Sequence, residues 1–233
     1  MLSAAIAAGD RDRQMQSIRM CYRLIAFISM PAALGITAFA HPLLSLLFGY
    51  DPTSVSMAAP LLSCLGISVF LSCMITATNS VLHGYRKVKS PILSMIMGAM
   101  TKIVFAYFLI GNPEIGLMGA PVSTFLCNGV IVLANLFFAS RLCHVSGLVG
   151  MLFRPFAAST LAVGAGLWIY QSNVNSLANS SLWVLACMGI IGILYAVLAC
   201  LFGAIEREDI LSLPMGNCLE RILRFFHLLK KIE

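Results

Sequence analysis

Six stretches of roughly 20 or more mostly apolar residues, separated by short polar breaks, constrain this chain more than any other feature. A helix needs about 20 such residues to cross the hydrocarbon core of a bilayer. Only 10% of the residues are charged, whereas water-soluble domains contain about 25%. The sequence therefore predicts an all-α integral membrane helix bundle. Its six predicted spans are about 22–48, 58–83, 91–111, 117–140, 151–170 and 182–204.

The basic residues are distributed asymmetrically among the breaks between these spans. Fourteen of the fifteen lie around the start of the first span, between the second and third, around the fourth-to-fifth connection, or after the sixth. The connections 49–57, 112–116 and 171–181 contain no Lys or Arg. Because short cytoplasmic loops are enriched in these residues, both termini are predicted to be cytoplasmic. The same placement accounts for the net charge of +6 without a nucleic-acid partner.

The segments outside the spans differ in character from the predicted six-helix region at 21–205. Residues 1–20 predict a cytoplasmic amphipathic segment, and they lack the compact apolar core of a secretion signal. In residues 206–233, apolar and basic residues alternate at helical spacing. Such a tail helix suits the surface of an anionic cytoplasmic leaflet. We therefore expect anionic membrane lipids among the partners.

Polar residues at helical spacing mark one face of the second predicted span. This stripe can line a substrate path, or it can hold helices together by hydrogen bonds worth roughly 0.6–2 kcal/mol each. Serine and threonine alone favour the second interpretation, whereas Asn79 and His83 near the cytoplasmic end favour a wet cavity or gate. The stripe consists of Ser68, Ser72, Thr76, Asn79 and His83, and the fourth span carries a thinner set of Thr124, Asn128 and Asn135.

Lys102 is the one basic residue outside the cytoplasmic set, and it lies near the middle of the 91–111 span. A charge there costs about 2.5–3.5 kcal/mol on insertion scales, so it is expected to face the bundle interior or a water-filled cavity. No acidic residue lies within the six predicted spans. Lys102 therefore has two possible roles. It can be a functional cation that anchors an anionic headgroup or takes part in a conformational switch, or it can be a lysine paired with carbonyls or a carboxylate elsewhere in the bundle.

Pro31 lies well inside the first predicted span and removes one backbone hydrogen bond from its helix. Kinks of this kind let transporter helices bend between states, although a static kink is equally permitted. Pro31 is therefore a hinge candidate.

The sequence contains no motif of an enzyme active site. It has no glycine-rich phosphate loop, no His-Glu-x-x-His pair and no nucleophile elbow. We therefore expect no catalytic residue, metal or cofactor. Ion-driven drug exporters commonly bind the coupling ion through an intramembrane Asp or Glu, and the predicted spans have none.

Ordered strings of residues along nearly the whole chain resemble a known transporter superfamily. Their order and spacing are similar to those of the polysaccharide and lipid II flippases of the multidrug/oligosaccharidyl-lipid/polysaccharide exporter superfamily, most closely the stage V sporulation protein B branch. The chain has His83 where many relatives have Gln. The strings are Ala4–Asp10, Pro31–Gly35, His41–Leu44, Leu47–Gly49, Leu82–Pro91, Gly98–Ile103, Leu109–Gly116, Gly119–Thr124 and Asp209–Pro214.

The resemblance implies a 14-helix, two-lobed transporter of a bacterial cell membrane. Such a transporter moves polyprenyl-pyrophosphate-linked saccharide to the outer leaflet by alternating access, in cell-wall, sporulation or polysaccharide synthesis. This chain corresponds to helices nine to fourteen, so the missing N-terminal lobe is an expected partner. Lys102 and the Ser72–His83 stripe are then expected to line part of the substrate path. The alternatives are a multidrug antiporter of the same superfamily and a non-transporting subunit of a cell-envelope synthase complex.

Overall fold

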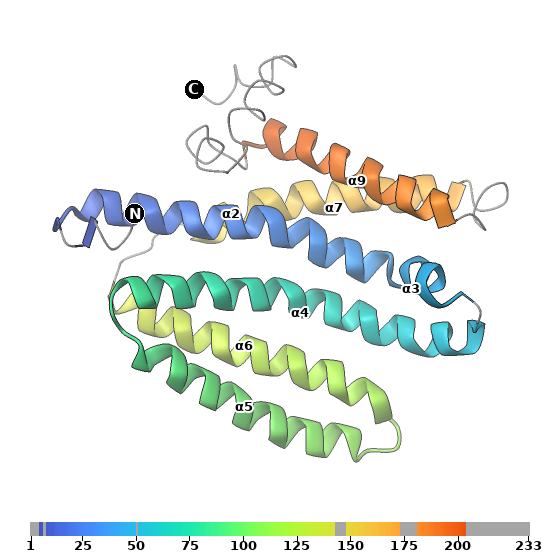
Figure 1. The fold of residues 1–233 in the computed structure, drawn as a ribbon, viewed down its shortest axis with the longest axis horizontal. Helices are drawn as coiled ribbons and strands as arrows, with labels where there is room; N and C mark the ends of the chain where they lie inside the picture. The colour runs from blue at the N-terminus through green and yellow to red at the C-terminus, as the bar shows by residue number, and fades with distance from the viewer. Residues whose placement is uncertain (1–4, 7, 50, 143–147, 173–180, 204–233) are drawn as a thin grey trace.

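The computed structural model describes residues 5–6, 8–49, 51–142, 148–172 and 181–203. Within these ranges the chain is almost entirely helical and contains no strand, as the all-α prediction requires. Long helices run side by side, joined by short links (Figure 1). They are α2 (Arg11–Ala38), α4 (Pro52–Gly84), α5 (Lys89–Ile110), α6 (Gly119–Ser140), α7 (Leu148–Ser172) and α9 (Ser181–Leu201), with the short α3 (Ala40–Phe48) and the 3-10 turn η1 (Gly116–Met118) between them.

Five segments are long and apolar enough to cross a membrane: Arg11–Ala38, Pro52–Gly84, Lys89–Ile110, Gly116–Ser140 and Leu152–Ser172. The sixth predicted span, 182–204, corresponds to α9, whose stretch Trp183–Ala199 is a shorter apolar helix. Only 11–33% of the most apolar window in each of the five is buried, so most of this apolar surface faces outward. An apolar exterior of this extent suits lipid, and the chain is a multi-pass membrane protein. The predicted tail 206–233 lies outside the described residues.

The first predicted span, 22–48, differs from the observed helices in two respects. It is divided at Phe39, because α2 ends at Ala38 and α3 begins at Ala40. Pro42 explains the break: proline has no N–H to donate to the Ala38 carbonyl four residues earlier, and its ring collides with that carbonyl. In addition, α2 begins at Arg11 and not near residue 22. Much of the predicted segment 1–20 therefore forms the first turns of this helix.

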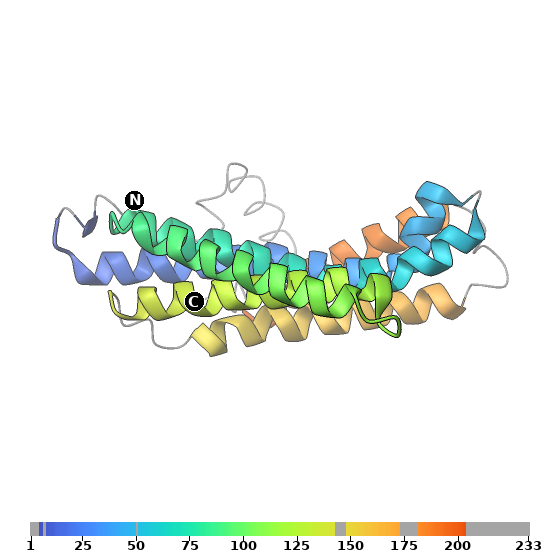
Figure 2. The same cartoon turned by 90° about the horizontal axis from the view of Figure 1, so that it is seen from below.

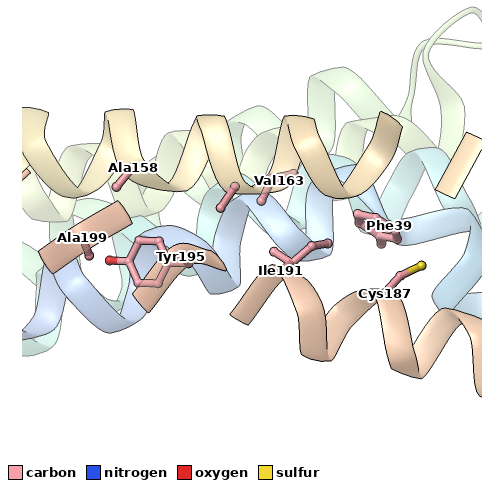
Figure 3. Packing of buried hydrophobic residues seen from close by; sticks show 8 residues of the cluster. Phe39, Ala158, Val163, Cys187, Ile191, Tyr195 and Ala199 are labelled. Atoms are coloured by element: carbon pink, nitrogen blue, oxygen red, sulfur yellow. The ribbon is translucent and has the colours of Figure 1, made fainter. Parts of the chain in front are cut away.

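Two hydrophobic clusters lie on opposite sides of α2. The first joins α2 to α4 and α6, and the second joins the α2–α3 junction to α7 and α9 (Figure 1). Figure 3 shows the second cluster, in which Phe39, Ile191 and Tyr195 are buried together with Ala158 and Val163 of α7. Helix α5 packs mainly on α6, at the edge of the bundle. Helices α2 and α4 therefore lie between the α5–α6 pair and the α7–α9 pair.

The connections richest in arginine and lysine lie at one end of the bundle. The start of α2, the α4–α5 turn and the end of α6 lie together there in both views (Figures 1 and 2). We call this the basic end. The links before α4 and between α5 and α6 lie at the opposite end. The alternation of basic and non-basic connections along the sequence thus corresponds to two ends in space. The basic end carries Arg11, Arg86, Lys87, Lys89 and Arg141.

Gly98 lies at a close contact between α5 and α6. A Cβ atom added there would lie 3.2 Å from the Cys127 carbonyl oxygen and would collide with the Ile131 side chain. By contrast, a Cβ at Gly129, on α6, would meet nothing within 4 Å. The absent side chain at residue 98 therefore allows close packing of these helices.

Gly98→Ala is expected to lower the free energy of unfolding by about 1 kcal/mol, because Ile131 must leave its packed position. The matched change Gly129→Ala is expected to raise it by up to about 1 kcal/mol, since alanine is the better helix former. Thermal unfolding of both variants in detergent measures the difference. Equal shifts in the two variants would contradict close packing at Gly98.

Candidate functional site

Two polar contacts connect the α4 stripe to α6. The amide nitrogen Nδ2 of Asn128 donates to Ser72 Oγ at 2.9 Å and lies 3.4 Å from the Ser68 carbonyl oxygen. Two turns nearer the basic end, Nδ2 of the fully buried Asn135 donates to Asn79 Oδ1 at 2.7 Å. A second bond from Asn135, of 3.1 Å, reaches the hydroxyl of Thr78. The structure therefore pairs Ser72 and Asn79 with α6, as the interhelical interpretation expects.

The other polar residues of the stripe take no part in these interhelical bonds. Thr76 is exposed, and its hydroxyl donates to the Ser72 carbonyl oxygen of its own helix at 3.2 Å. Thr124 does the same on α6, donating to the Ala120 carbonyl oxygen at 3.0 Å. His83 is exposed near the end of α4. Because local bonds satisfy both threonine hydroxyls, these side chains can border an open path without an unpaired donor.

Asn135→Leu is expected to lower the free energy of unfolding by about 0.6–1.7 kcal/mol, because Asn79 Oδ1 loses its donor. Thr124→Val is the matched control on the same helix, since its hydroxyl bonds only within α6. Denaturant unfolding in detergent compares the two. A loss at Thr124 as large as that at Asn135 would contradict a specific role for the Asn135 contact.

The side chain of Lys102 is exposed, although its position lies on the face of α5 that packs on α6. This helix packs on α6 through the buried Pro91, Ser94 and Gly98, and Lys102 follows Gly98 by one turn. Among the described residues, no carboxylate lies within ion-pair distance of Lys102.

The surroundings of Lys102 are apolar, and the structure does not bring it to the α4 stripe. Its neighbours on α5, Met100 and Ile103, are exposed by 61% and 67%, and no hydrogen bond joins Lys102 to a stripe residue among those described. A charge on such a surface requires water, a counter-ion or another part of a larger protein beside it.

Pro31 lies within the continuous helix α2, and the backbone group that it leaves unpaired is satisfied from another helix. In a regular helix the N–H of residue 31 would bond to the carbonyl of Phe27. Here the hydroxyl of Tyr195, on α9, donates to the Phe27 carbonyl oxygen at 2.7 Å. The two aromatic rings also meet, with centroids 5.2 Å apart. The hinge candidate is therefore held by α9.

Tyr195 is the site residue that the sequence patterns did not single out. It is only 5% exposed and lies in the most apolar of the predicted spans. A tyrosine there gives one usable signal, because its buried hydroxyl needs a hydrogen-bond partner. The partner could not be inferred, since Phe27 lies 168 residues away in the sequence.

Residues 1–108 match the family model described as MatE. The matched stretch includes α2, α3, α4 and nearly all of α5, and thus Pro31, Lys102 and the α4 stripe. At this coarser level, the predicted similarity to the exporter superfamily is confirmed. No match singles out the sporulation or lipid II flippase branch. Neither the search of curated proteins nor the search of solved structures gave a match.

Proposed function

We propose that this chain is the C-terminal part of a membrane flippase that exports polyprenyl-pyrophosphate-linked saccharide by alternating access. The match to the MatE model and the apolar helix bundle support a membrane transporter of this superfamily. Members of that family are transporters and not enzymes. The substrate class depends on a further observation, the charge of Lys102.

Lys102 is a cation near the middle of an apolar span, exposed and without a carboxylate partner among the described residues. A pyrophosphate carries the opposite charge, so the headgroup can offset the unfavourable placement of the ammonium group in the membrane. An organic cation would instead be repelled. The polar stripe is a separate surface from Lys102, and there the hydroxyl oxygens of Thr76 and Thr124 can accept hydrogen bonds from sugar hydroxyls.

The six helices require a second lobe for transport in this proposal. The exposed surface around Lys102 is then completed by an N-terminal lobe, and the substrate moves between the two lobes. The basic end faces the cytoplasm of a bacterial cell, because cytoplasmic connections are the ones enriched in Arg and Lys.

Two alternatives lead to different experimental outcomes. The MatE match is equally consistent with a multidrug exporter, which would move cationic drugs in place of a lipid-linked sugar. A non-transporting subunit would instead co-purify with a glycosyltransferase and leave translocation unchanged.

Co-reconstitution tests the proposal. The chain is placed in liposomes together with the N-terminal lobe of a polysaccharide-exporting member of the superfamily, and the transfer of polyprenyl-pyrophosphate-linked sugar between leaflets is measured. Transfer that requires both parts supports the flippase. Transfer of a cationic dye but not of the lipid favours the multidrug alternative, and transfer of neither substrate would overturn the transport proposal.

A further inference from the structure

A cavity of about 670 Å³ opens at the basic end of the bundle. Its walls come from three places far apart in the sequence: the start of α2, the turn after α4, and the end of α6. The volume lies within the range of small-molecule sites, about 300–1,000 Å³. The cavity is lined by Gly9, Arg11, Gln14, Met15, Tyr85, Ser140, Arg141 and Leu142.

The charge of this lining is positive. Arg11 and Arg141 contribute two guanidinium groups, and no carboxylate lines the cavity. The nearby Asp10 is already engaged: its Oδ2 lies 3.1 Å from Arg13 Nε, and its Oδ1 accepts the Arg13 backbone N–H at 3.1 Å. Within the described part of the chain, neither cavity arginine forms an ion pair. Asp12 follows Arg11 on α2 but does not line the cavity.

The polar walls are held in place by contacts of their own. Tyr85 donates its hydroxyl hydrogen to Gln14 Oε1 at 3.1 Å, and Gln14 Nε2 donates to the Ala5 carbonyl oxygen at 3.2 Å. The Arg141 guanidinium carbon lies 4.5 Å from the centroid of the Phe137 ring. These contacts join α2 to the end of α4 and restrain Arg141, so the cavity is bordered by side chains that are already positioned.

We propose that this cavity binds a phosphate or pyrophosphate group, carried either by an anionic lipid or by a free ion. The planar guanidinium group donates two parallel hydrogen bonds to phosphate oxygens, which makes arginine well suited to this ligand. The hydroxyl of Ser140 also lines the cavity, but its hydrogen is donated to the Phe137 carbonyl oxygen at 2.8 Å, so the two arginines are the donors for the phosphate oxygens. The location at one end of a membrane bundle also suits the depth of lipid headgroups. The site does not depend on the transport proposal, because it requires binding alone.

Binding measurements on the purified chain test the site directly. Isothermal titration calorimetry in neutral detergent measures the affinity for inorganic pyrophosphate. Native mass spectrometry counts the phosphatidylglycerol retained after reconstitution in phosphatidylcholine bilayers with or without that lipid. Arg141→Gln and Arg11→Gln are expected to weaken whichever ligand binds by about tenfold each. Lys89→Gln removes the same charge from a residue at the basic end that does not line the cavity, and its effect is expected to stay below about threefold.

The outcomes separate the two sources of the phosphate group. Retention of phosphatidylglycerol without pyrophosphate binding identifies a lipid headgroup site, and the reverse result identifies a free-ion site. Absence of both, or equal losses in the Lys89 and Arg141 variants, would overturn the proposal. Unchanged thermal unfolding of each variant shows that the loss is one of binding and not of folding. Because no translocation is measured, a negative result here leaves the flippase proposal standing.

Discussion

Lys102→Ala is expected to reduce transfer of polyprenyl-pyrophosphate-linked sugar in the co-reconstituted system by roughly tenfold or more. Loss of one hydrogen-bonded charge from a headgroup contact corresponds to about 1.5–3 kcal/mol, and each 1.4 kcal/mol is a factor of about ten in affinity. The same variant is expected to retain or gain thermal stability, since it removes an unpaired charge from an apolar helix surface.

Two matched variants make the Lys102 experiment specific. Lys102→Arg keeps the positive charge and is expected to retain most of the transfer activity. Lys89→Ala removes a lysine from the first turn of the same helix, at the basic end, and is expected to have little effect. Full transfer by Lys102→Ala would reject Lys102 as a headgroup anchor, even if the chain is still part of a flippase.

Tyr195→Phe is expected to lower the free energy of unfolding by about 1–3 kcal/mol, because the Phe27 carbonyl is then left without a donor in an apolar environment. The ring remains, so the aromatic contact with Phe27 is retained and the hydroxyl alone is tested. Amide hydrogen exchange in α2 around Pro31 is expected to accelerate. Denaturant unfolding and exchange mass spectrometry measure both effects.

The Pro31→Ala background provides the decisive comparison for Tyr195. Alanine restores the N–H that can bond to Phe27, so Tyr195→Phe in this background is expected to have a much smaller effect. Tyr170→Phe is the matched control, because Tyr170 also packs by its ring, against Phe39. Additive effects of the changes at residues 31 and 195 would contradict the assignment of Tyr195 as the partner of the proline-freed carbonyl.

Several features of the candidate site could be predicted from the sequence, and others could not. The spacing of Ser72, Thr76 and Asn79 correctly indicated one face of a helix. It could not indicate that Ser72 and Asn79 bond to α6 whereas Thr76 bonds to its own backbone. That difference depends on how α4 is rotated about its axis against α6. Hydrophobic periodicity contains little information about this rotation in a span that is apolar on most sides.

The break at Phe39 shows that hydropathy alone does not predict where a helix is interrupted within an apolar stretch. Residues 22–48 form one apolar stretch, and an unbroken span was the natural expectation. Pro42 could have predicted the break, since a proline cannot donate a hydrogen bond to the carbonyl four residues earlier and its ring collides with that carbonyl. Pro31 has the same chemistry, yet α2 continues through it, and Tyr195 donates to the freed carbonyl. A proline in the sequence therefore does not by itself show whether the helix ends there.

The amino-acid sequence alone determined the approximate positions of the apolar segments and the separation of basic from non-basic connections. These properties follow from hydropathy and charge, which are sums over neighbouring residues. Only the tertiary structure decided that Asn128 meets Ser72, that Tyr195 supports the helix at Pro31, and that Arg11 and Arg141 share one cavity. Each of these contacts joins residues more than 50 positions apart in the sequence, and each depends on the packing of helices whose relative rotation and depth the apolar pattern leaves open.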